Sequence, residues 1–382
     1  MNECVNKPKK LREKIPESIR LRLWVKSGGR CAHCNEVVYR DSFTLMSDNF
    51  SEIAHIIASS NDGPRGSELS ENLQIDYDNL ILLCSKCHKL VDGDNKNKFP
   101  VEKLQQIKEE HERRIEILTS IDRNAKTHVL IIQSSIGINH VEVNKKDVNI
   151  AVIENRMYPS EEKPYCIDLT NDEGRGDSSF YLAKAKQLKN ALKDFIGRFD
   201  SASERQHISV FPLALMPLLV CFGRELGNKH AIQLFQHNRI EDDWVWKDEN
   251  NTTEYFVKKP KNPIQKSDVF LKIAISDSIG EDKLKSIPDI NSNIYEIGIE
   301  NPTPHFLVHR DLIPKFDVIY RQILNEIQRF HGANCNINLL MAAPAPIAIQ
   351  CGLSLLPGKD PNIWAYDYDK NYGGFIKALK VN

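Results

Sequence analysis

Residues 82–94, LLCSKCHKLVDGD, decide how the N-terminal region of the chain is interpreted. Within them Cys84, Cys87 and His88 form the pattern C-x-x-C-H. Two chemistries fit this pattern: covalent attachment of c-type haem, and half of a four-ligand zinc site followed by a histidine with a separate role. Residues elsewhere in the chain distinguish between these two.

A second C-x-x-C pair, Cys31 and Cys34, lies upstream. Haem is attached covalently in exported proteins, whereas residues 1–14, MNECVNKPKKLREK, lack the apolar segment of a signal peptide. In a reducing compartment, paired cysteines favour metal binding over a disulfide. We therefore predict one structural zinc site with four thiolate ligands, namely Cys31, Cys34, Cys84 and Cys87. A zinc ribbon with no further role is the alternative.

The hydrophobic pattern around these cysteines predicts a small α+β unit. Helices are expected over residues 16–26 and 100–121, where apolar side chains recur at helical spacing. A strand is expected over 50–57, followed by an exposed polar loop over 59–72. If the second cysteine pair begins a helix, His88 and Asp92 lie on one face of it and can hold a second, catalytic cation.

Four short motifs occur in one order between residues 16 and 118. They are Gly28-Gly29-Arg30-Cys31-x-x-Cys34, Ala54-His55-Ile56, Asn79-Leu80 and Leu83-Cys84-x-x-Cys87-His88. In this combination they resemble the HNH, or ββα-metal, endonucleases that carry a zinc-binding C-x-x-C on each side of the active site. The resemblance implies a metal-dependent nuclease that hydrolyses DNA.

The resemblance also implies individual roles. His55 is expected to be the general base that activates water, and Asn79 to orient the His55 imidazole through its amide. His88 is expected to bind the catalytic cation, Mg²⁺ or another divalent ion, with Asp92 as a further ligand. This chemistry suits phosphodiester hydrolysis, because a base near neutral pKa activates the water and a hard cation neutralises the phosphate.

One position departs from the family pattern. Many members have Asp or His as a metal ligand directly before the general base, where this chain has Ala54. Glu52 or Asp92 is expected to compensate. Residues 7–30 are rich in Lys and Arg, which fits contact with DNA phosphates without sequence readout, although a solvated helix face explains the charge equally well.

After residue 127 the pattern changes to short β-rich runs that alternate with amphipathic segments. Strands are predicted over 128–133, 148–153, 207–215, 270–276, 294–300 and 337–343, and helices over 180–199 and 316–330. Strands alternating with helices predict an α/β layered domain with a largely parallel sheet.

This region also repeats itself. Residues 208–223, ISVFPLALMPLLVCFG, align without a gap on residues 337–352, INLLMAAPAPIAIQCG, at an offset of 129 residues. At the same offset Leu234-Phe235 meets Ile363-Trp364. A weaker match, at a different offset, joins Ser135-Ile136-Gly137 to Ser278-Ile279-Gly280. Several matches in one order predict two Rossmann-like halves related by a pseudo-twofold axis, with a ligand cleft at the carboxyl ends of their strands.

Polar and aromatic side chains follow the ends of the predicted strands, where a ligand is expected. Hydroxyl groups and Arg bind phosphate or ribose, and Trp or Tyr can stack on bases. The candidate ligand-binding residues are Ser134, Ser135, Arg239, Trp246, Ser276, Asp277, Trp364 and Tyr366.

The two repeated segments are similar to the halves of a SAVED domain, a fusion of two CARF-like units, over roughly residues 125–382. An HNH nuclease followed by SAVED is the layout of effectors in bacterial anti-phage signalling by cyclic oligonucleotides (CBASS). The resemblance implies that a cyclic di- or trinucleotide, made by a partner cyclase, binds the cleft and activates degradation of double-stranded DNA. It also implies a homo-oligomer, a dimer at rest and a larger assembly when active.

The whole chain is thus expected to hold an HNH domain (1–121), a linker (122–127) and a SAVED domain (128–382) with halves of about 128–260 and 261–382. The 382 residues are 41% hydrophobic and 27% charged, with no long apolar run, so we expect a cytoplasmic protein without a membrane span. The alternative function is a zinc-stabilised, catalytically inactive regulator that binds nucleic acid and senses a nucleotide. An ungated nuclease would leave the large repeat without a role.

Overall fold

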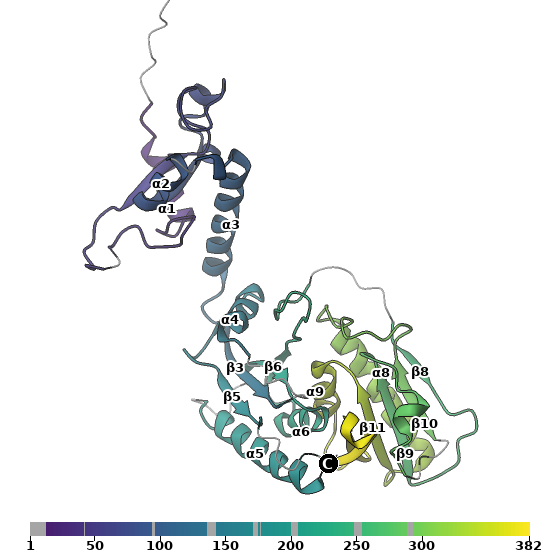
Figure 1. Ribbon diagram of the computed structural model, residues 1–382. Helices are drawn as coiled ribbons and strands as arrows, with labels where there is room; N and C mark the ends of the chain where they lie inside the picture. Colours follow the sequence, from purple (N-terminus) through teal and green to yellow (C-terminus); the bar gives the residue numbers. More distant parts are fainter. Residues whose placement is uncertain are drawn as a thin grey trace, which may run out of the picture. The chain divides into compact units, whose positions relative to one another are not determined.

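The computed structural model describes residues 13–41, 43–93, 96–135, 143–170, 175, 177–199, 205–247, 254–288, 290 and 293–382. The chain forms two compact units, Met1–Ile121 (unit 1) and Asp122–Asn382 (unit 2), whose elements are labelled in Figure 1. None of the helices in these described ranges combines the length and apolar character needed to span a bilayer.

Unit 1 is built on an antiparallel pair of strands and the helix that follows it. Strand β1 (Ser51–His55) pairs with β2 (Leu80–Cys84), and β2 leads directly into α2 (Ser85–Asp92). The flanking helices are α1 (Glu17–Lys26) and α3 (Val101–Ser120), as predicted from apolar spacing. Three short 3₁₀ turns, Ser70–Leu73, Tyr77–Asn79 and Lys96–Lys98, complete the unit.

The core of unit 1 forms around β2. Leu80, Ile81, Leu82 and Leu83 are all buried, so this short strand is covered on both faces. The ladder sets His55 opposite Leu80 and Ser51 opposite Cys84. This register places the second cysteine pair and His55 at opposite ends of the same two-stranded sheet.

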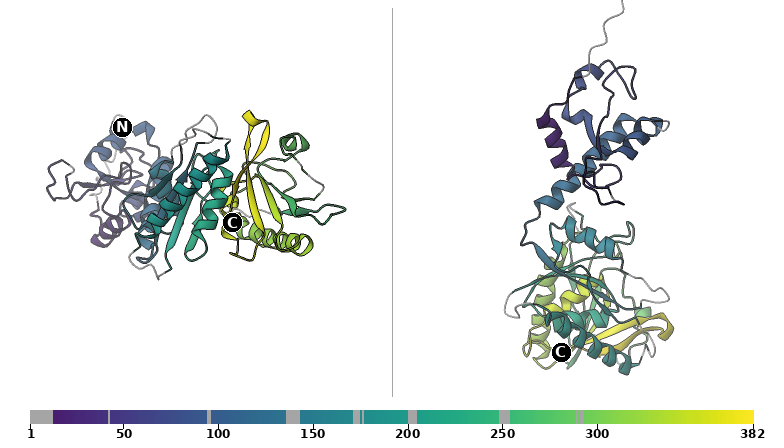
Figure 2. Two further views of the ribbon diagram at one scale, coloured as in Figure 1. Left: turned by 90° about the horizontal axis from the view of Figure 1, so that it is seen from below. Right: turned by 90° about the vertical axis from the view of Figure 1, so that its left-hand side faces the viewer.

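Unit 2 contains two sheets, which lie side by side (Figures 1 and 2). The first has the order β4-β3-β6-β7, with β5 beside β3; the second has the order β13-β12-β11-β9-β10-β8. The strands of the first sheet are β3 (Lys126–Gln133), β4 (Tyr158–Pro159), β5 (Tyr165–Asp168), β6 (His207–Leu213) and β7 (Ala231–Leu234). Those of the second are β8 (Phe256–Lys258), β9 (Asp268–Ala274), β10 (Ile294–Gly298), β11 (Asn336–Ala342), β12 (Asn362–Asp369) and β13 (Gly374–Lys380).

Helices connect and cover these strands. They are α4 (Lys145–Glu154), α5 (Ser178–Ile196), α6 (Met216–Leu226), α7 (Glu281–Leu284), α8 (Leu312–His331) and α9 (Ala345–Leu353), with a 3₁₀ turn at Lys370–Tyr372. The central strands of both sheets are parallel, which confirms the predicted α/β architecture of this region. Strand β3 begins at Lys126, inside the segment expected to be a linker.

The strand predicted over 148–153 is wrong, because these residues belong to α4. Val148, Ala151 and Val152 are buried, and their spacing of three and four residues gives one apolar helical face. The side chain of Asn144 accepts a hydrogen bond from the N–H of Lys146 (2.9 Å) and caps the helix. The β-branched residues suggested a strand, but burial on one helical face outweighed their propensity.

Helices α6 and α9 pack against each other at the centre of unit 2, and their aligned glycines explain why. A Cβ atom on Gly223 would lie 2.1 Å from the carbonyl oxygen of Ile349, and one on Gly352 would lie 2.0 Å from that of Val220. Only glycine permits backbones to approach this closely. The repeat therefore marks a contact in which each half presents its glycine to the other.

The strand ladders correct one detail of the repeat. Ala231 pairs with His207 in the first sheet, and Asn362 pairs with Asn336 in the second. The offset from β7 to β12 is therefore 131 residues, whereas the offset from β6 to β11 is 129. Two extra residues lie in the connection between α9 and β12, so the predicted match of Leu234-Phe235 with Ile363-Trp364 is out of register.

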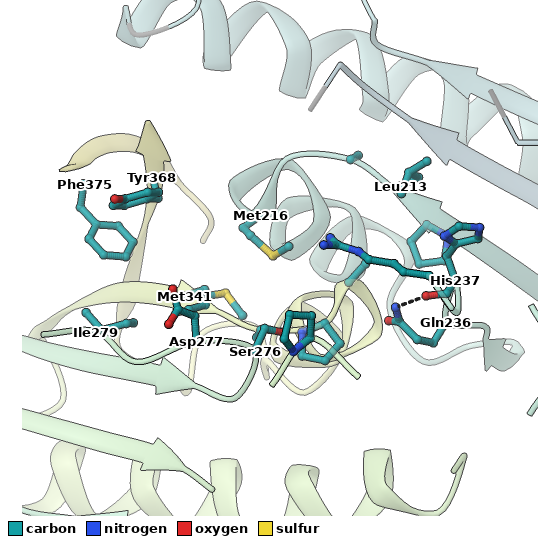
Figure 3. A pocket seen from close by; sticks show the side chains of 18 of the residues that line it. Leu213, Met216, Gln236, His237, Ser276, Asp277, Ile279, Met341, Tyr368 and Phe375 are labelled. Atoms are coloured by element: carbon teal, nitrogen blue, oxygen red, sulfur yellow. Dashed lines mark hydrogen bonds between the residues drawn. The ribbon is translucent and has the colours of Figure 1, made fainter. Parts of the chain in front are cut away.

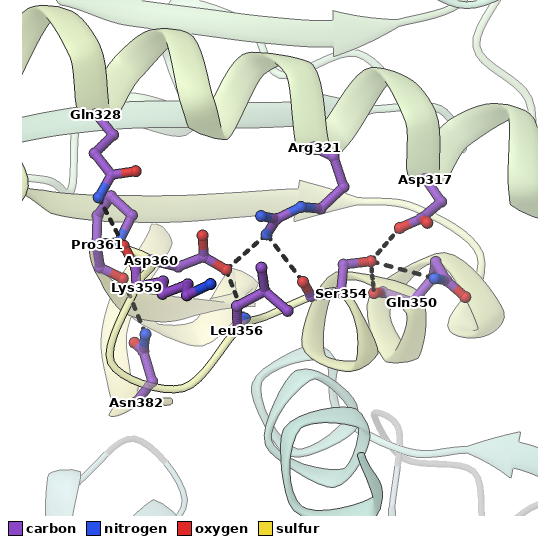
Figure 4. Close-up of polar contacts among 10 residues, drawn as sticks. All are labelled: Asp317, Arg321, Gln328, Gln350, Ser354, Leu356, Lys359, Asp360, Pro361 and Asn382. Carbon is purple, nitrogen blue, oxygen red and sulfur yellow. Dashed lines mark hydrogen bonds and ion pairs between the residues drawn. The ribbon is translucent and has the colours of Figure 1, made fainter. Parts of the chain in front are cut away.

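A polar network holds this longer connection against α8 (Figure 4). The Arg321 guanidinium donates to the carbonyl of Ser354 (2.9 Å) and to Asp360 (2.6 Å). The same Asp360 oxygen accepts from the N–H of Leu356 (2.6 Å). Because the Asp360 side chain is only 3% exposed, this ion pair fixes the loop before β12 enters the sheet.

Candidate functional site

The four paired cysteines come together in unit 1. The sulfur atoms of Cys31, Cys34, Cys84 and Cys87 lie within 4.8 Å of one another, and the Cys34 and Cys84 sulfurs are 3.7 Å apart. Two thiolates on a tetrahedral zinc ion, at Zn–S of about 2.3 Å, are about 3.8 Å apart. The arrangement fits zinc, and it is the one group of three or more His, Cys, Asp or Glu ligands found in the described ranges.

Local backbone bonds shape this cluster. The N–H of Ala32 donates to the carbonyl of Leu82 (2.9 Å), which ties the first cysteine turn to β2. The N–H of Cys87 donates to the Cys84 sulfur (3.4 Å), so Cys84 caps α2. Burial raises the pKa of Cys34 to about 11. Burial opposes ionisation of Cys84 as well, but the Cys87 N–H and the thiols of Cys87, Cys34 and Cys31 together outweigh it and lower the pKa of Cys84.

His55 ends β1 and is only 8% exposed. Its Nε2 lies 2.9 Å from the carbonyl oxygen of Gln74. A carbonyl oxygen only accepts hydrogen bonds, so in neutral His55 the proton is on Nε2 and Nδ1 is the basic nitrogen. The geometry thus selects the tautomer that can take a proton from water at Nδ1.

Asn79 supports this arrangement indirectly. Its amide nitrogen donates to the carbonyls of Ile57 (2.9 Å) and Leu73 (3.0 Å), and its oxygen accepts from the N–H of Ile57 (2.7 Å). Both amide hydrogens are used by main-chain carbonyls, which differs from the expectation that Asn79 orients the imidazole itself. Asn79 instead fixes the main chain at Leu73, directly before Gln74, whose carbonyl oxygen contacts the His55 imidazole.

His88 and Asp92 lie on one face of α2, as predicted. The Nε2 of His88 is 3.2 Å from Asp92 Oδ2. Burial works against ionisation of Asp92, but the His88 and Arg65 contacts outweigh it and hold its pKa below the usual range. The pair offers two ligand atoms to a hard cation such as Mg²⁺, which normally completes its shell with water and substrate oxygens.

Arg65 is a central residue that sequence patterning did not identify, since it lies in the expected polar loop. Its side chain is only 7% exposed and donates to the carbonyls of Ile56 (2.7 Å) and Val91 (2.8 Å). Its Nη2 is 2.5 Å from Asp92 Oδ1 and 3.4 Å from the carbonyl of His55. Arg65 therefore joins the end of β1 to the end of α2.

The strand geometry removes Glu52 from the candidate cation ligands. Side chains alternate between the faces of a strand, so Glu52 and Ala54 share one face of β1 and His55 lies on the other. Glu52 is exposed, whereas His55 is buried. The compensation expected for Ala54 therefore does not come from Glu52.

Part of the basic segment lies outside the described residues, which begin at residue 13. On α1, Arg20 and Lys26 are exposed, and Lys14 precedes them. The Arg22 guanidinium lies 4.0 Å from the centre of the Tyr77 ring, where it packs as a cation–π contact. The exposed cations remain available for contact with an anionic partner.

Unit 2 contains a cavity of about 300 Å³ at the carboxyl ends of the central strands of both sheets (Figure 3). Three candidate ligand residues line it: Arg239 from the first half, and Ser276 and Asp277 after β9. Its floor consists of the two equivalent turns that lead from β6 into α6 and from β11 into α9. Residues 212–214 and 216 line the cavity from the first turn, and residues 341–345 line it from the second.

The floor offers hydrogen-bond donors. Both α6 and α9 begin there, and no side chain caps either N-terminus. Met216 and Ala345, the first residues of the two helices, both line the cavity. Two positive helix ends at one cavity favour an anionic ligand.

The wall from the second half adds charge and aromatic surface. The Lys283 ammonium donates to Asp277 (2.6 Å) and to the carbonyl of Ser278 (2.6 Å). It also lies 5.8 Å from the centre of the Tyr368 ring. Tyr368 packs edge-on against Phe375 with ring centres 5.2 Å apart, and both line the cavity.

Five candidate ligand residues do not line this cavity. Ser134 accepts from the N–H of Leu215 (2.9 Å), and Ser135 donates to the carbonyl of Thr170, so both buried hydroxyls stabilise loops. Trp364 packs under the Lys377 ammonium (4.0 Å). The remaining two are Tyr366, which is buried and donates to Asn338, and Trp246, which lines a smaller neighbouring cavity.

The cavity also uses residues that were not predicted, among them Gln236, Lys283 and Phe375. His237 and Tyr368, which belong to the polar residues that follow the predicted strands, line it as well. When β7 and β12 are aligned with allowance for the two inserted residues, His237 lies opposite Tyr368, because these two residues differ by the ladder offset of 131. The ungapped alignment, with its offset of 129, places His237 opposite Tyr366 instead.

A family model described as "SMODS-associated and fused to various effectors sensor domain" (SAVED) matches residues 188–381. A search of curated proteins finds no match to this chain.

Solved structures include the Cap4 SAVED/CARF-domain containing receptor of Acinetobacter baumannii with the cyclic trinucleotide 2'3'3'-cAAA, at 14% identity and a TM-score of 0.42. This chain spans 66% of that receptor, slightly less than two thirds, and 82% of this chain is covered. The Cap4 receptor of Moraxella osloensis gives 12% identity, a TM-score of 0.40 and coverage of 82% and 66%.

The family match covers about half of the chain and includes α6, α9 and the whole second sheet. It therefore spans most of the elements that form the cavity. The chain belongs to the SAVED family of sensor domains.

Proposed function

We propose that this protein is a DNA endonuclease of the HNH type that a cyclic oligonucleotide activates through the SAVED cavity, in bacterial anti-phage defence. The observation that carries the proposal is the combination in one chain of a sensor cavity with two positive helix ends and a ββα unit that holds His55, His88 and Asp92. The first element suits a ligand with several phosphates. The second suits hydrolysis of a phosphodiester.

For the ligand, the floor and walls of the cavity supply complementary chemistry. The helix N-termini at Met216 and Ala345 are placed to receive phosphodiester oxygens, with Arg239 and Lys283 as charged groups beside them. Tyr368 and Phe375 offer aromatic faces to bases. A cyclic di- or trinucleotide carries all of these groups in one ring.

For the nuclease, His55 is the general base. Gln74 holds the imidazole with Nδ1 as the proton acceptor, and that nitrogen takes the proton of the attacking water. His88 and Asp92 would hold a divalent cation, with Arg65 fixing the orientation of Asp92. When bound, the cation supplies charge neutralisation for the scissile phosphate and the departing oxygen. The zinc cluster keeps β2 and α2 in place for both residues.

A specific observation favours a second candidate, a regulator that binds nucleic acid without cutting it. Asp92 is already paired with Arg65, and the described residues place no further His, Asp or Glu ligand with His88 and Asp92. In that case the protein would bind DNA in response to the ligand but leave it intact. DNA cleavage distinguishes this regulator from the nuclease.

The test incubates the full-length protein with plasmid DNA and Mg²⁺, with and without a panel of cyclic oligonucleotides. Loss of intact plasmid only in the presence of one ring supports the proposal. His55→Ala should reduce the cleavage rate by about 10²- to 10⁴-fold, the usual contribution of a general base. The control is Glu109→Ala, which changes an exposed residue of α3.

Ligand binding and zinc content of His55→Ala should equal those of the parent protein. Cleavage at the parental rate would exclude His55 as the base, and DNA binding without cleavage by the parent would favour the regulator. Size-exclusion chromatography with the active ring tests whether a resting dimer grows into a larger assembly on activation.

A further inference from the structure

The two halves of unit 2 each contain a hairpin at the same place in the repeat. In the second half, β12 turns at Asp369, which lies opposite Gly374, and the chain continues into the antiparallel β13. In the first half, Asn238 follows β7 and forms an antiparallel bridge with Asp243. Asn238 and Asp369 differ by the ladder offset of 131 residues, so the two turns are equivalent.

The returning arms of the two hairpins differ. In the second half β13 pairs with β12 as far as Trp364, and the N–H of Val381 donates to the carbonyl of Ile363 (2.8 Å). In the first half the N–H of Lys247 donates to the carbonyl of Val308 (3.0 Å), and no strand among the described residues pairs with the outer edge of β7. The edge that β13 covers in one half is therefore open in the other.

The open edge of β7 presents main-chain donors and acceptors to a cavity. The N–H groups of Ala231 and Phe235 donate to main-chain carbonyls on the β6 side (2.8 and 2.9 Å). Because the main-chain groups of alternate residues in a parallel strand face opposite neighbours, those of Ile232 and Leu234 point away from β6. They have no hydrogen-bond partner in the described part of the chain. Ile232 and Leu234 line a cavity of about 570 Å³, whose other wall is the start of α8.

The Gln233 side chain adds a donor to this cavity. Gln233 lines the cavity and is only 7% exposed, and its Oε1 accepts from the Nδ2 of Asn155 (2.6 Å). The Asn155 oxygen in turn accepts from Arg310 (3.3 Å), a group that only donates, so the orientation of both amides is fixed. The Nε2 of Gln233 is left buried and has no partner among the described residues. Buried donors are rarely unpaired, so an acceptor is expected at this point of the cavity.

The charges around the cavity favour an acidic group as that acceptor. Asp311 is paired with Lys315 (2.7 Å), and Asp317 accepts from the Ser354 hydroxyl (Figure 4). Arg310 lines the cavity too, and within the described ranges its guanidinium has no carboxylate partner. A carboxylate that enters the cavity would therefore meet one unpaired cation and one unpaired amide donor.

We propose that the edge of β7 docks an extended segment of a partner protein, which adds as an antiparallel strand along the four residues of β7. The main-chain groups of Ile232 and Leu234 bind the added strand. One acidic side chain of the segment accepts from Gln233 Nε2 and pairs with Arg310. Side chains alternate along a strand, so the neighbours of that acidic residue meet Ile232, Leu234 and Ile313, which belong to the main apolar core. The segment therefore carries an acidic residue between two apolar ones.

Fluorescence anisotropy of dye-labelled peptides with the full-length protein tests this proposal. The probes are three acetylated and amidated peptides: VTVEVTV; VTVKVTV, in which lysine replaces glutamate; and VTPEPTV, in which two prolines remove main-chain donors. We expect VTVEVTV to bind at least about tenfold more tightly than either of the others. The lysine peptide tests the charge, and the proline peptide tests the strand pairing.

Two variants locate the site on the protein. Ile232→Pro removes an N–H that β6 does not use, which is where a sheet edge tolerates proline, and should weaken binding of VTVEVTV at least about tenfold. Arg310→Glu should reverse the preference between the glutamate and lysine peptides. Arg329→Glu, the same change at an exposed position near the other end of α8, should leave both affinities unchanged.

Three results overturn the proposal: no binding of VTVEVTV at millimolar concentration, equal binding of VTPEPTV, or parental binding by both variants. Sedimentation velocity of the parent and of Ile232→Pro examines a second copy of the chain as the occupant. A parent dimer that this variant dissociates would assign the edge to a second copy and overturn the proposal of a partner protein. These measurements use neither DNA nor a cyclic oligonucleotide, so their outcome is independent of the proposed function.

Discussion

The two units of this chain use different means to hold their candidate functional residues. Unit 1 has a small core around β2, and its candidate site lies beside a cluster of four cysteines and the buried Arg65. In unit 2 the main apolar core joins both sheets with α5, α6, α8 and α9, two smaller apolar clusters complete the unit, and the cavity lies at the start of the closely packed α6 and α9. Where the core is small, a cysteine cluster that fits zinc and a buried polar network accompany it, and where the core is large, close helix packing does.

The largest expected effect tests the zinc cluster. Cys84→Ser should unfold unit 1 and leave unit 2 folded, because structural zinc contributes about 10–16 kcal/mol of apparent binding free energy to small domains. Calorimetry should show one thermal transition in place of two, and metal analysis should show loss of bound zinc. Cys166→Ser, at an exposed position in β5, is the control. Two unchanged transitions would mean that the core of unit 1 is sufficient by itself.

The next effect is specific to unit 2. Gly223→Ala should lower the free energy of unfolding of this unit by at least about 3 kcal/mol, since the added Cβ overlaps backbone atoms of α9, which cannot move aside as a side chain does. Chemical denaturation followed by circular dichroism measures it. Gly197→Ala is the control. Gly197 has a negative φ that alanine adopts readily, and the nearest atom to an added Cβ is a carbonyl oxygen at 3.2 Å. Equal stability of the two variants would contradict the proposed role of the helix contact.

A smaller loss is expected at Arg65. Arg65→Lys keeps the charge but cannot make the same set of hydrogen bonds, so unit 1 should lose about 1–3 kcal/mol of stability as buried carbonyls lose their donor. The rate of DNA cleavage should fall by more than the loss of folded protein accounts for, because Arg65 no longer holds the Asp92 carboxylate in its orientation. Arg113→Lys, on the exposed face of α3, is the control. Parental cleavage by Arg65→Lys would show that Asp92 needs no such support.

The smallest effect concerns the pH dependence of the stability of unit 2. Burial lowers the pKa of His207, His230 and His331 in unit 2. These imidazoles take up protons more readily in the unfolded chain, so their contribution to stability is present at neutral pH and is lost as pH falls below their ordinary value of 6.5.

The melting temperature of unit 2 should therefore be lower at pH 5 than at pH 7, and His331→Gln should reduce this difference. The His331 Nδ1 accepts from the N–H of Lys266 (3.4 Å), which protonation prevents. His305→Gln, at an exposed position, should leave the difference unchanged. A melting temperature of unit 2 that is independent of pH would contradict this account.

Predictions from sequence succeeded where a few neighbouring residues decide the structure. The helix that begins at Ser85 and the shared face of His88 and Asp92 follow from spacing within one segment. The strand expected over 148–153 failed because burial on a helical face depends on neighbours that lie far away in the chain. Arg65 was missed for a related reason: its partners, Ile56 and Val91, come from two other elements.

The sequence by itself determined the four cysteines, the aligned glycines Gly223 and Gly352, and the alternation of strands and helices, since each is a matter of residue type and local spacing. Only the tertiary structure decided which side chains face the cavity. Two extra residues before β12 place Tyr368, and not Tyr366, at the level of the cavity, because a two-residue shift keeps a side chain on the same face of the strand but moves it along the strand. That register is set by pairing between distant segments, which no local pattern specifies.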